Sequence, residues 1–94
     1  METRILSKGK ISDLELTTTG FSLGGNPFSI YVRNKTGLVE NDVLVRCRLI
    51  CDSEAGDFPV PVGDWTPGMI VSIAPNTIDP EHYDVYWGAS ETTI

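Results

Sequence analysis

The sequence predicts an all-β domain, an antiparallel β-sandwich or barrel of about six or seven short strands with at most one helical turn. Three observations support this prediction. Apolar and polar residues alternate over several short segments, as they do in half-buried strands. Nine glycines and six prolines divide the 94 residues into short pieces. Strand-like segments recur at the spacing typical of antiparallel sandwiches. The whole chain, residues 1–94, fits a single domain.

Four segments alternate in the manner of a strand with one buried face. They are 14–20 (LELTTTG), 28–34 (FSIYVRN), 43–51 (VLVRCRLIC) and 83–88 (YDVYWG). In the second of these, Ile30 and Val32 share the apolar face and Tyr31 takes the other. Segment 69–74 (MIVSIA) is apolar on both faces, which predicts a central strand. Residues 4–12 allow one more strand, with Gly9 at a turn or bulge.

Two local signals refine this arrangement. Pro59 and Pro61 have the same parity, so both missing N–H groups belong to the same side of one strand, which predicts an edge strand. Asp79 is placed to cap a single helical turn with Pro80 at its first position.

Cys47 and Cys51 are expected to be free thiols in the core. In a strand, four residues span about 13 Å, whereas a disulfide needs Cα atoms within about 7 Å. Both cysteines fall on the apolar face of segment 43–51, where burial disfavours the thiolate. Free thiols are typical of a reducing compartment, and we therefore expect a soluble protein that folds in a cytoplasm.

The charges are divided unevenly along the chain. Residues 1–48 contain all seven basic residues and five acidic ones, whereas residues 49–94 contain eight acidic residues and no basic one. The net charge is −6. An acidic protein is a poor ligand for phosphate backbones, so we expect no nucleic-acid partner. The acidic half either keeps the surface solvated or meets a basic surface on a partner or a second copy.

No segment predicts catalysis, a cofactor or a metal site. Residues 52–57 (DSEAGD) carry three acids, but the glycine and the closing residue do not fit a calcium loop, so a solvated turn is expected. One histidine and a C-x₃-C spacing do not make a zinc site. No segment approaches the ~20 apolar residues of a membrane span. The protein is therefore expected not to be an enzyme and to have no membrane partner.

Four aromatic residues in the last third of the chain are the best binding candidates. They are Trp65, Tyr83, Tyr86 and Trp87, and carboxylates surround them in the sequence. The favoured interpretation places Trp87 and Tyr83 toward the core and leaves Tyr86 and part of Trp65 exposed. The alternative is a sugar-binding surface made by the exposed rings. Trp65 follows the turn at Gly63-Asp64 and is expected to cap one end of the core.

Residues 58–90 resemble a pattern found in small virion proteins of tailed phages and prophages of gut Bacteroidales, crAss-like phages included. The similar elements are Gly63-Asp64-Trp65-Thr66-Pro67, Ile70 and Ile73, Ile78-Asp79, and Tyr83-Asp84-Val85-Tyr86-Trp87-Gly88. The resemblance implies a structural role without a cofactor, such as head decoration, an auxiliary capsid protein or a fibre-attachment module. It also implies that the protein is located in the virion after folding in the host cytoplasm.

The sequence thus predicts a non-enzymatic structural protein that acts through protein–protein contacts. Its expected partners are copies of itself, capsid proteins or tail proteins. A small carbohydrate-binding module is the alternative. The candidate interface residues are Trp65, Tyr86, Arg46, Arg48 and Asp64.

Overall fold

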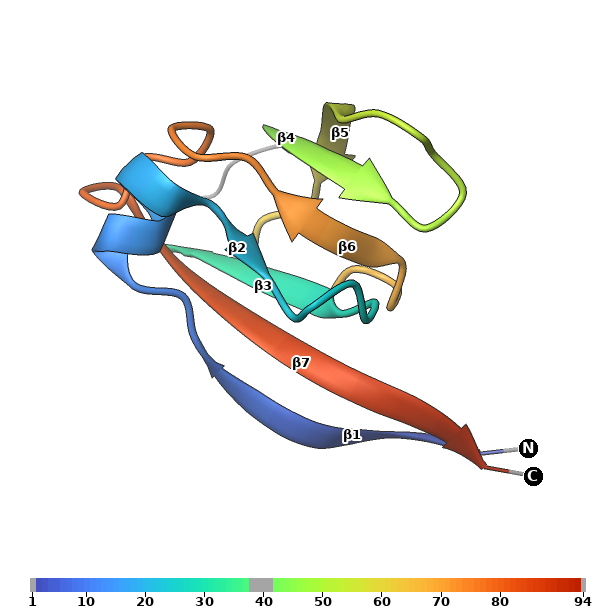
Figure 1. Ribbon diagram of the computed structural model, residues 1–94. Coiled ribbons are helices and arrows are strands. Elements are labelled where there is room, and N and C mark those ends of the chain that lie inside the picture. Colours follow the sequence, from blue (N-terminus) through green and yellow to red (C-terminus); the bar gives the residue numbers. More distant parts are fainter. Residues whose placement is uncertain (1, 38–41, 94) are drawn as a thin grey trace.

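The computed structural model describes residues 2–37 and 42–93, and over these residues the chain forms two antiparallel β-sheets (Figure 1). The all-β prediction is confirmed. The strands described are β1 (Glu2–Lys10), β2 (Phe21–Ser22), β3 (Ser29–Asn34), β4 (Val43–Leu49), β5 (Gly56–Val60), β6 (Ile70–Ile73) and β7 (Tyr83–Thr93). The three-stranded sheet has the order β1-β7-β3, and the four-stranded sheet has the order β2-β6-β4-β5.

The longest strand, β7, organises the three-stranded sheet. It pairs with β1 along one edge and with β3 along the other, and both pairs are antiparallel. β1 and β7 run side by side from the pair Glu2–Thr93 to the pair Lys10–Tyr86 (Figure 1). The first and last strands of the chain are therefore neighbours, which brings residues 8–10 next to residues 86–88.

The core lies between the two sheets and follows the alternation of the sequence. Ile30 and Val32 of β3 and Val85 of β7 have no exposed surface, and Val45 of β4 faces them from the other sheet with none. β6 is a central strand, as predicted, because it pairs with both β2 and β4. A bridge between Phe28 and Ile70 joins the two sheets along one side.

Gly9 has a different role from the one predicted. It lies within the β1–β7 ladder opposite Trp87, and the register of this ladder shifts between Ile5 and Ser7 instead. A Cβ atom on Gly9 would come within 2.9 Å of the indole Nε1 of Trp87. The ring of Trp87 also packs near Phe21, at a centroid distance of 5.9 Å. Gly9 therefore leaves room for a half-buried tryptophan on the inner face of the sheet.

The strand predicted over residues 14–20 is wrong, because this segment is helical. Glu15–Thr19 forms a π-helical turn, η1, that continues from helical residues 13 and 14. At its start, the side chains of Ser12 and Glu15 each accept a hydrogen bond from the backbone N–H of the other residue. The Glu15 N–H donates to Ser12 Oγ (3.2 Å) and the Ser12 N–H donates to Glu15 Oε1 (3.1 Å). This is a capping box. No helix of the described segments is long and apolar enough to cross a membrane.

The prediction of an edge strand at Pro59 is confirmed. β5 ends the four-stranded sheet, and Pro59 is paired with Leu44 of β4. Because proline has no N–H to give, this pair is one of the positions at which an antiparallel ladder makes no hydrogen bonds.

The expected burial of both cysteines is only half correct. Cys47 is buried, but Cys51 is exposed, and both are free thiols. β4 ends at Leu49, where a turn forms as the Asp52 N–H donates to the Leu49 carbonyl (3.0 Å). The turn ends the alternation, so Cys51 no longer shares the face of Cys47.

The turn predicted after Asp79 forms as expected. Asp79 Oδ1 accepts the Glu81 N–H at 2.9 Å, and the Asp79 carbonyl accepts the Tyr83 N–H at 3.0 Å. This turn leads directly into β7 and fixes where the central strand of the three-stranded sheet begins.

Candidate functional site

Three exposed or half-exposed aromatic side chains lie in one row across the outer face of the three-stranded sheet. Tyr31 of β3 is paired with Tyr86 of β7, and Tyr86 is paired with Lys10 of β1. Residues directly opposite each other in an antiparallel pair project to the same side of the sheet. Trp65 continues the row through a bridge to Tyr31. We call Tyr31, Trp65 and Tyr86 the aromatic shelf.

The backbone around Trp65 is held along the free edge of β3. The Gly63 N–H donates to the Val32 carbonyl at 2.8 Å, and the Thr66 N–H donates to the Ile30 carbonyl at 3.0 Å. The buried hydroxyl of Thr66 accepts the Ile30 N–H at 3.0 Å. Gly63 has a φ of 89°, a conformation that favours glycine. Hydrogen bonds on both sides of Trp65 therefore fix its position beside β3.

Trp65 is not placed as the sequence suggested. It does not cap one end of the core but lies on the outer face, where 37% of its surface is exposed. The expected partial exposure is correct, and its location follows from the pairing of residues 62–65 with β3. The favoured interpretation of the other rings agrees with the structure, since Trp87 and Tyr83 pack against the core.

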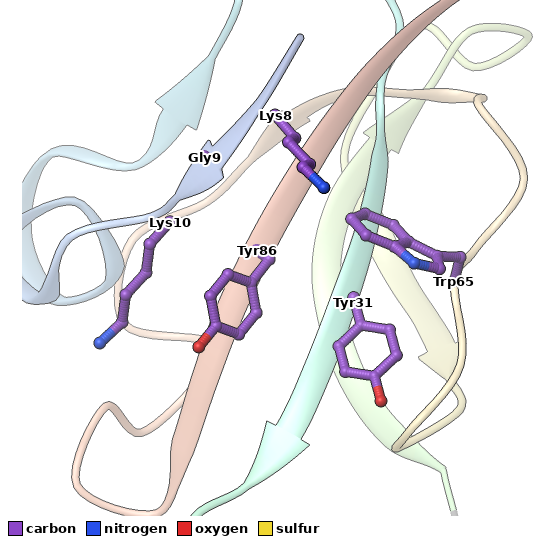
Figure 2. A pocket seen from close by; sticks show the side chains of 6 residues that line it. All are labelled: Lys8, Gly9, Lys10, Tyr31, Trp65 and Tyr86. Carbon is purple, nitrogen blue, oxygen red and sulfur yellow. The ribbon is translucent and has the colours of Figure 1, made fainter. Parts of the chain in front are cut away.

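The aromatic shelf borders a cavity of about 510 Å³ that opens to solvent (Figure 2). Its remaining walls are Lys8, Gly9 and Lys10 of β1. The ring centroids of Tyr31 and Trp65 are 5.4 Å apart with planes tilted by 52°, and those of Tyr31 and Tyr86 are 6.4 Å apart with a tilt of 60°. The rings therefore form a faceted hollow and not one flat platform.

Lys8 and Lys10 line one side of this hollow, and further basic residues lie near Asp84. Lys10 Nζ lies 3.0 Å from Asp84 Oδ1, and Lys35 Nζ lies 3.7 Å from the same oxygen. The hydrogen bond from Lys10 holds the pKa of Asp84 below its usual value and raises the pKa of Lys10. Arg33 is paired with Asp84 in the ladder. Lys8 makes no ion pair within the part of the chain that is described.

The five predicted interface residues do not form one surface. Arg46 and Arg48 lie on β4 in the other sheet, where Arg46 pairs with Asp57 at 3.5 Å and Arg48 donates to the Asp52 carbonyl at 3.3 Å. Asp64 is exposed, and its carboxylate accepts the backbone N–H of the next residue at 2.9 Å. Only Trp65 and Tyr86 of the predicted set meet at the cavity.

Sequence reasoning did not select Tyr31, Lys8 and Lys10 as site residues. The alternation of segment 28–34 placed Tyr31 on the polar face, which was a usable signal. Lys8 and Lys10 join the site because β1 pairs with β7, and no local pattern encodes that pairing. The site is therefore assembled by the order of the strands.

Other reactive groups lie apart from the aromatic shelf. Burial raises the pKa of the Cys47 thiol. His82 Nε2 lies 3.4 Å from Asp79 Oδ2 on the surface. A second cavity, of about 350 Å³, is lined by residues 17 and 76–80. Within the described ranges, no three His, Cys, Asp or Glu side chains gather in a way that could hold a metal ion.

No known protein-family model matches this chain, and neither the comparison with curated proteins nor that with solved structures found a match.

Proposed function

We propose that the protein is a non-enzymatic structural module that acts through protein–protein contacts at the aromatic shelf. The observation that carries this proposal is the row Tyr86–Tyr31–Trp65 on a solvent-facing sheet surface. The core is filled by other residues, so packing between the sheets does not require these three rings. Tyrosine and tryptophan are enriched at protein interfaces, where they supply much of the binding energy.

The proposed setting is the virion of a tailed phage or prophage, in which the protein serves as head decoration, auxiliary capsid protein or fibre attachment. The resemblance of residues 58–90 supports this setting. Two members of the aromatic shelf, Trp65 and Tyr86, fall within that segment. A contact made by so few side chains is weak on its own, but it gains strength when many copies bind to a repeating lattice.

Cross-linking of purified particles tests this proposal directly. The three lysines of the chain are Lys8, Lys10 and Lys35. Lys8 and Lys10 line the cavity at the aromatic shelf, and Lys35 pairs with Asp84 on the same sheet. An amine-reactive cross-linker therefore probes mainly this face. We expect many copies of the protein per particle, with cross-links from these lysines to capsid proteins, tail proteins or other copies. Absence of the protein from washed particles would contradict the proposal.

A carbohydrate-binding module is the second candidate. It is favoured by the exposed ring of Trp65 near Lys8, which has no ion pair within the described residues. Sugars stack on aromatic faces while polar groups at the edge bind their hydroxyl or carboxylate groups. Because the rings are tilted by 52° and 60°, a sugar would stack on one ring at a time. Glycan-array binding that disappears in Trp65→Ala, by a protein absent from particles, would support this candidate instead.

A further inference from the structure

We infer that the cavity at the aromatic shelf receives the loop between β4 and β5 of a second copy of the chain. We call residues 50–55 of this loop the acidic loop. The inference rests on the proposed function, since it names one partner for the proposed contact surface. Three properties of the two surfaces support it: their shape, their charge and their placement on different sheets.

The cavity has the size and lining of a binding site for a short segment. Its volume of about 510 Å³ falls within the roughly 300–1,000 Å³ usual for ligand sites. Three aromatic rings supply apolar walls, and Lys8 stands at the rim without an acidic partner in the described part of the chain. Figure 2 shows Trp65 reaching from its loop toward Lys8. The cavity thus suits an apolar side chain flanked by a negative charge.

The acidic loop carries the complementary groups, an apolar side chain and negative charges, on a projecting segment. Ile50 is 61% exposed, so its aliphatic side chain is accessible for a contact. Asp52 and Glu54 are exposed and follow it closely in sequence. Arg48 lies beside the loop and donates to the Asp52 backbone carbonyl, but within the described residues neither Asp52 nor Glu54 forms an ion pair. The loop therefore presents an apolar side chain together with carboxylates.

The two surfaces belong to different sheets, so their contact joins unlike faces of neighbouring copies. The cavity lies on the outer face of β1-β7-β3, whereas the loop projects from the β4–β5 end of the other sheet (Figure 1). Such head-to-tail contacts repeat from copy to copy and give rings or rows. One loop in one cavity buries less area than a stable interface needs, so each contact is weak.

A carboxylate partner fits the charge better than a phosphate backbone does. The bases that line the cavity are Lys8 and Lys10, and Asp84 already pairs with Lys10. The net charge of −6 also repels a polyanion at a distance. A short acidic loop presents only a few negative charges to the exposed Lys8. Nucleic acid is therefore the disfavoured occupant and becomes an outcome of the test.

Sedimentation of charge-reversal variants tests the inference. We expect the wild-type protein to self-associate between about 10 μM and 1 mM, as small transient interfaces do, and less strongly at high salt. Lys8→Glu and Glu54→Lys should each weaken association about three- to tenfold, because each replaces an attraction by a repulsion. The double variant, with both charges exchanged, should recover most of the loss. Trp65→Ala should weaken association about tenfold.

Glu81→Lys is the matched control. It makes the same change of charge at an exposed glutamate outside both surfaces, and it should not weaken association. Lys8 and Glu54 are also exposed, so thermal unfolding can verify that all variants fold.

Three outcomes of the experiments in solution would overturn the inference. One is a monomer at all concentrations in low salt, and another is association that Lys8→Glu leaves unchanged. The third is Lys8-dependent binding of oligothymidylate without self-association, which would identify nucleic acid as the occupant. Particles in which Lys8 cross-links only to a different protein would reject the inference and leave the proposed function standing. Absence from particles would reject the proposed function itself.

Discussion

Gly9 influences the site because it connects the cavity on the outer face of β1 with the core packing on its inner face. Gly9 separates two lysines that line the cavity, and on the opposite face of β1 it lies against the ring of Trp87. The strand thus carries the rim of the site on one face and receives a core aromatic on the other. A change at Gly9 therefore affects the position of Lys8 and Lys10 through the packing beneath them.

Gly9→Ala should destabilise the protein by about 1–3 kcal/mol, the usual cost of overpacking. The new Cβ would lie 2.9 Å from Trp87 Nε1, and the indole is held by Phe21. Gly56→Ala is the control, because a Cβ atom there meets nothing within 4 Å. Denaturant unfolding measures both variants. Equal free energies of unfolding for the two would contradict the packing of Trp87 against Gly9.

Asp84 should make the stability of the folded protein decrease at acidic pH. The hydrogen bond from Lys10 lowers the pKa of Asp84 in the folded protein, so the folded state favours the carboxylate. Its contribution is complete above the ordinary carboxyl pKa of about 4 and is lost as the pH falls through the lower, folded-state value. Asp84→Asn should therefore lose less stability than the wild type between pH 6 and pH 2. Thermal melts at several pH values measure this difference.

The comparison variant for Asp84→Asn is Glu81→Gln, which removes an exposed carboxylate that has no ion pair within the described residues. It should keep the acid dependence of the wild type. The contribution of Asp84 would be disproved if Asp84→Asn and Glu81→Gln followed the same profile.

The two thiols should react differently in the native protein. Cys51 is exposed, whereas burial protects Cys47 and raises its pKa. We expect a thiol reagent to label one equivalent in native protein and two after unfolding, and no equivalent in native Cys51→Ser. Rapid labelling of two equivalents in native wild type would contradict the burial of Cys47.

For the secondary-structure elements, the alternation of apolar and polar residues predicted the strands well where one face of the strand is buried in the core and the other is exposed. β3, β4, β6 and β7 all lie within or across the segments that alternation or continuous apolarity identified. The error at 14–20 has a local cause. Ser12-Asp13-Leu14-Glu15 is a capping-box sequence, and its hydrogen bonds start a helix that the alternation of Leu14 and Leu16 does not reveal.

Ser12→Ala should destabilise the protein by about 0.5–2 kcal/mol, since it removes the hydroxyl that accepts the Glu15 N–H. Ser53→Ala is the control, because Ser53 is an exposed loop serine. Its free energy of unfolding should change by less than about 0.5 kcal/mol. The capping role would be refuted if Ser12→Ala were as stable as Ser53→Ala.

At the scale of the whole molecule, the order of strands creates the site. The sequence identified Trp65 and Tyr86 as binding candidates, but it did not bring them next to Tyr31 and Lys8. That step needs β1, the first strand, to pair with β7, the last, and it needs residues 62–65 to follow the edge of β3. Such pairings join residues far apart in the chain, and no local propensity specifies them.

The fold places the unevenly distributed charges of the chain on different parts of the molecule. The two lysines nearest the shelf come from β1, and the third, Lys35, follows β3. The exposed acids of residues 50–55 lie at the end of the other sheet. The lysines of the first half and the loop acids of the second half thus lie on separate surfaces, although Asp84 lies beside Lys10 and Arg48 lies beside Asp52. Contact between unlike faces of neighbouring copies needs such a separation.

An amide NMR spectrum of the labelled protein, recorded at increasing concentration, tests whether the acidic loop of one copy contacts the aromatic shelf of another. We expect the resonances of residues 8–10, 31, 65 and 86 to shift together with those of residues 50–55. We expect the resonances of residues 76–80, around the second cavity, to keep their positions. Shifts confined to another surface, or no shifts up to about 1 mM, the weak limit of such contacts, would contradict contact between the acidic loop and the aromatic shelf.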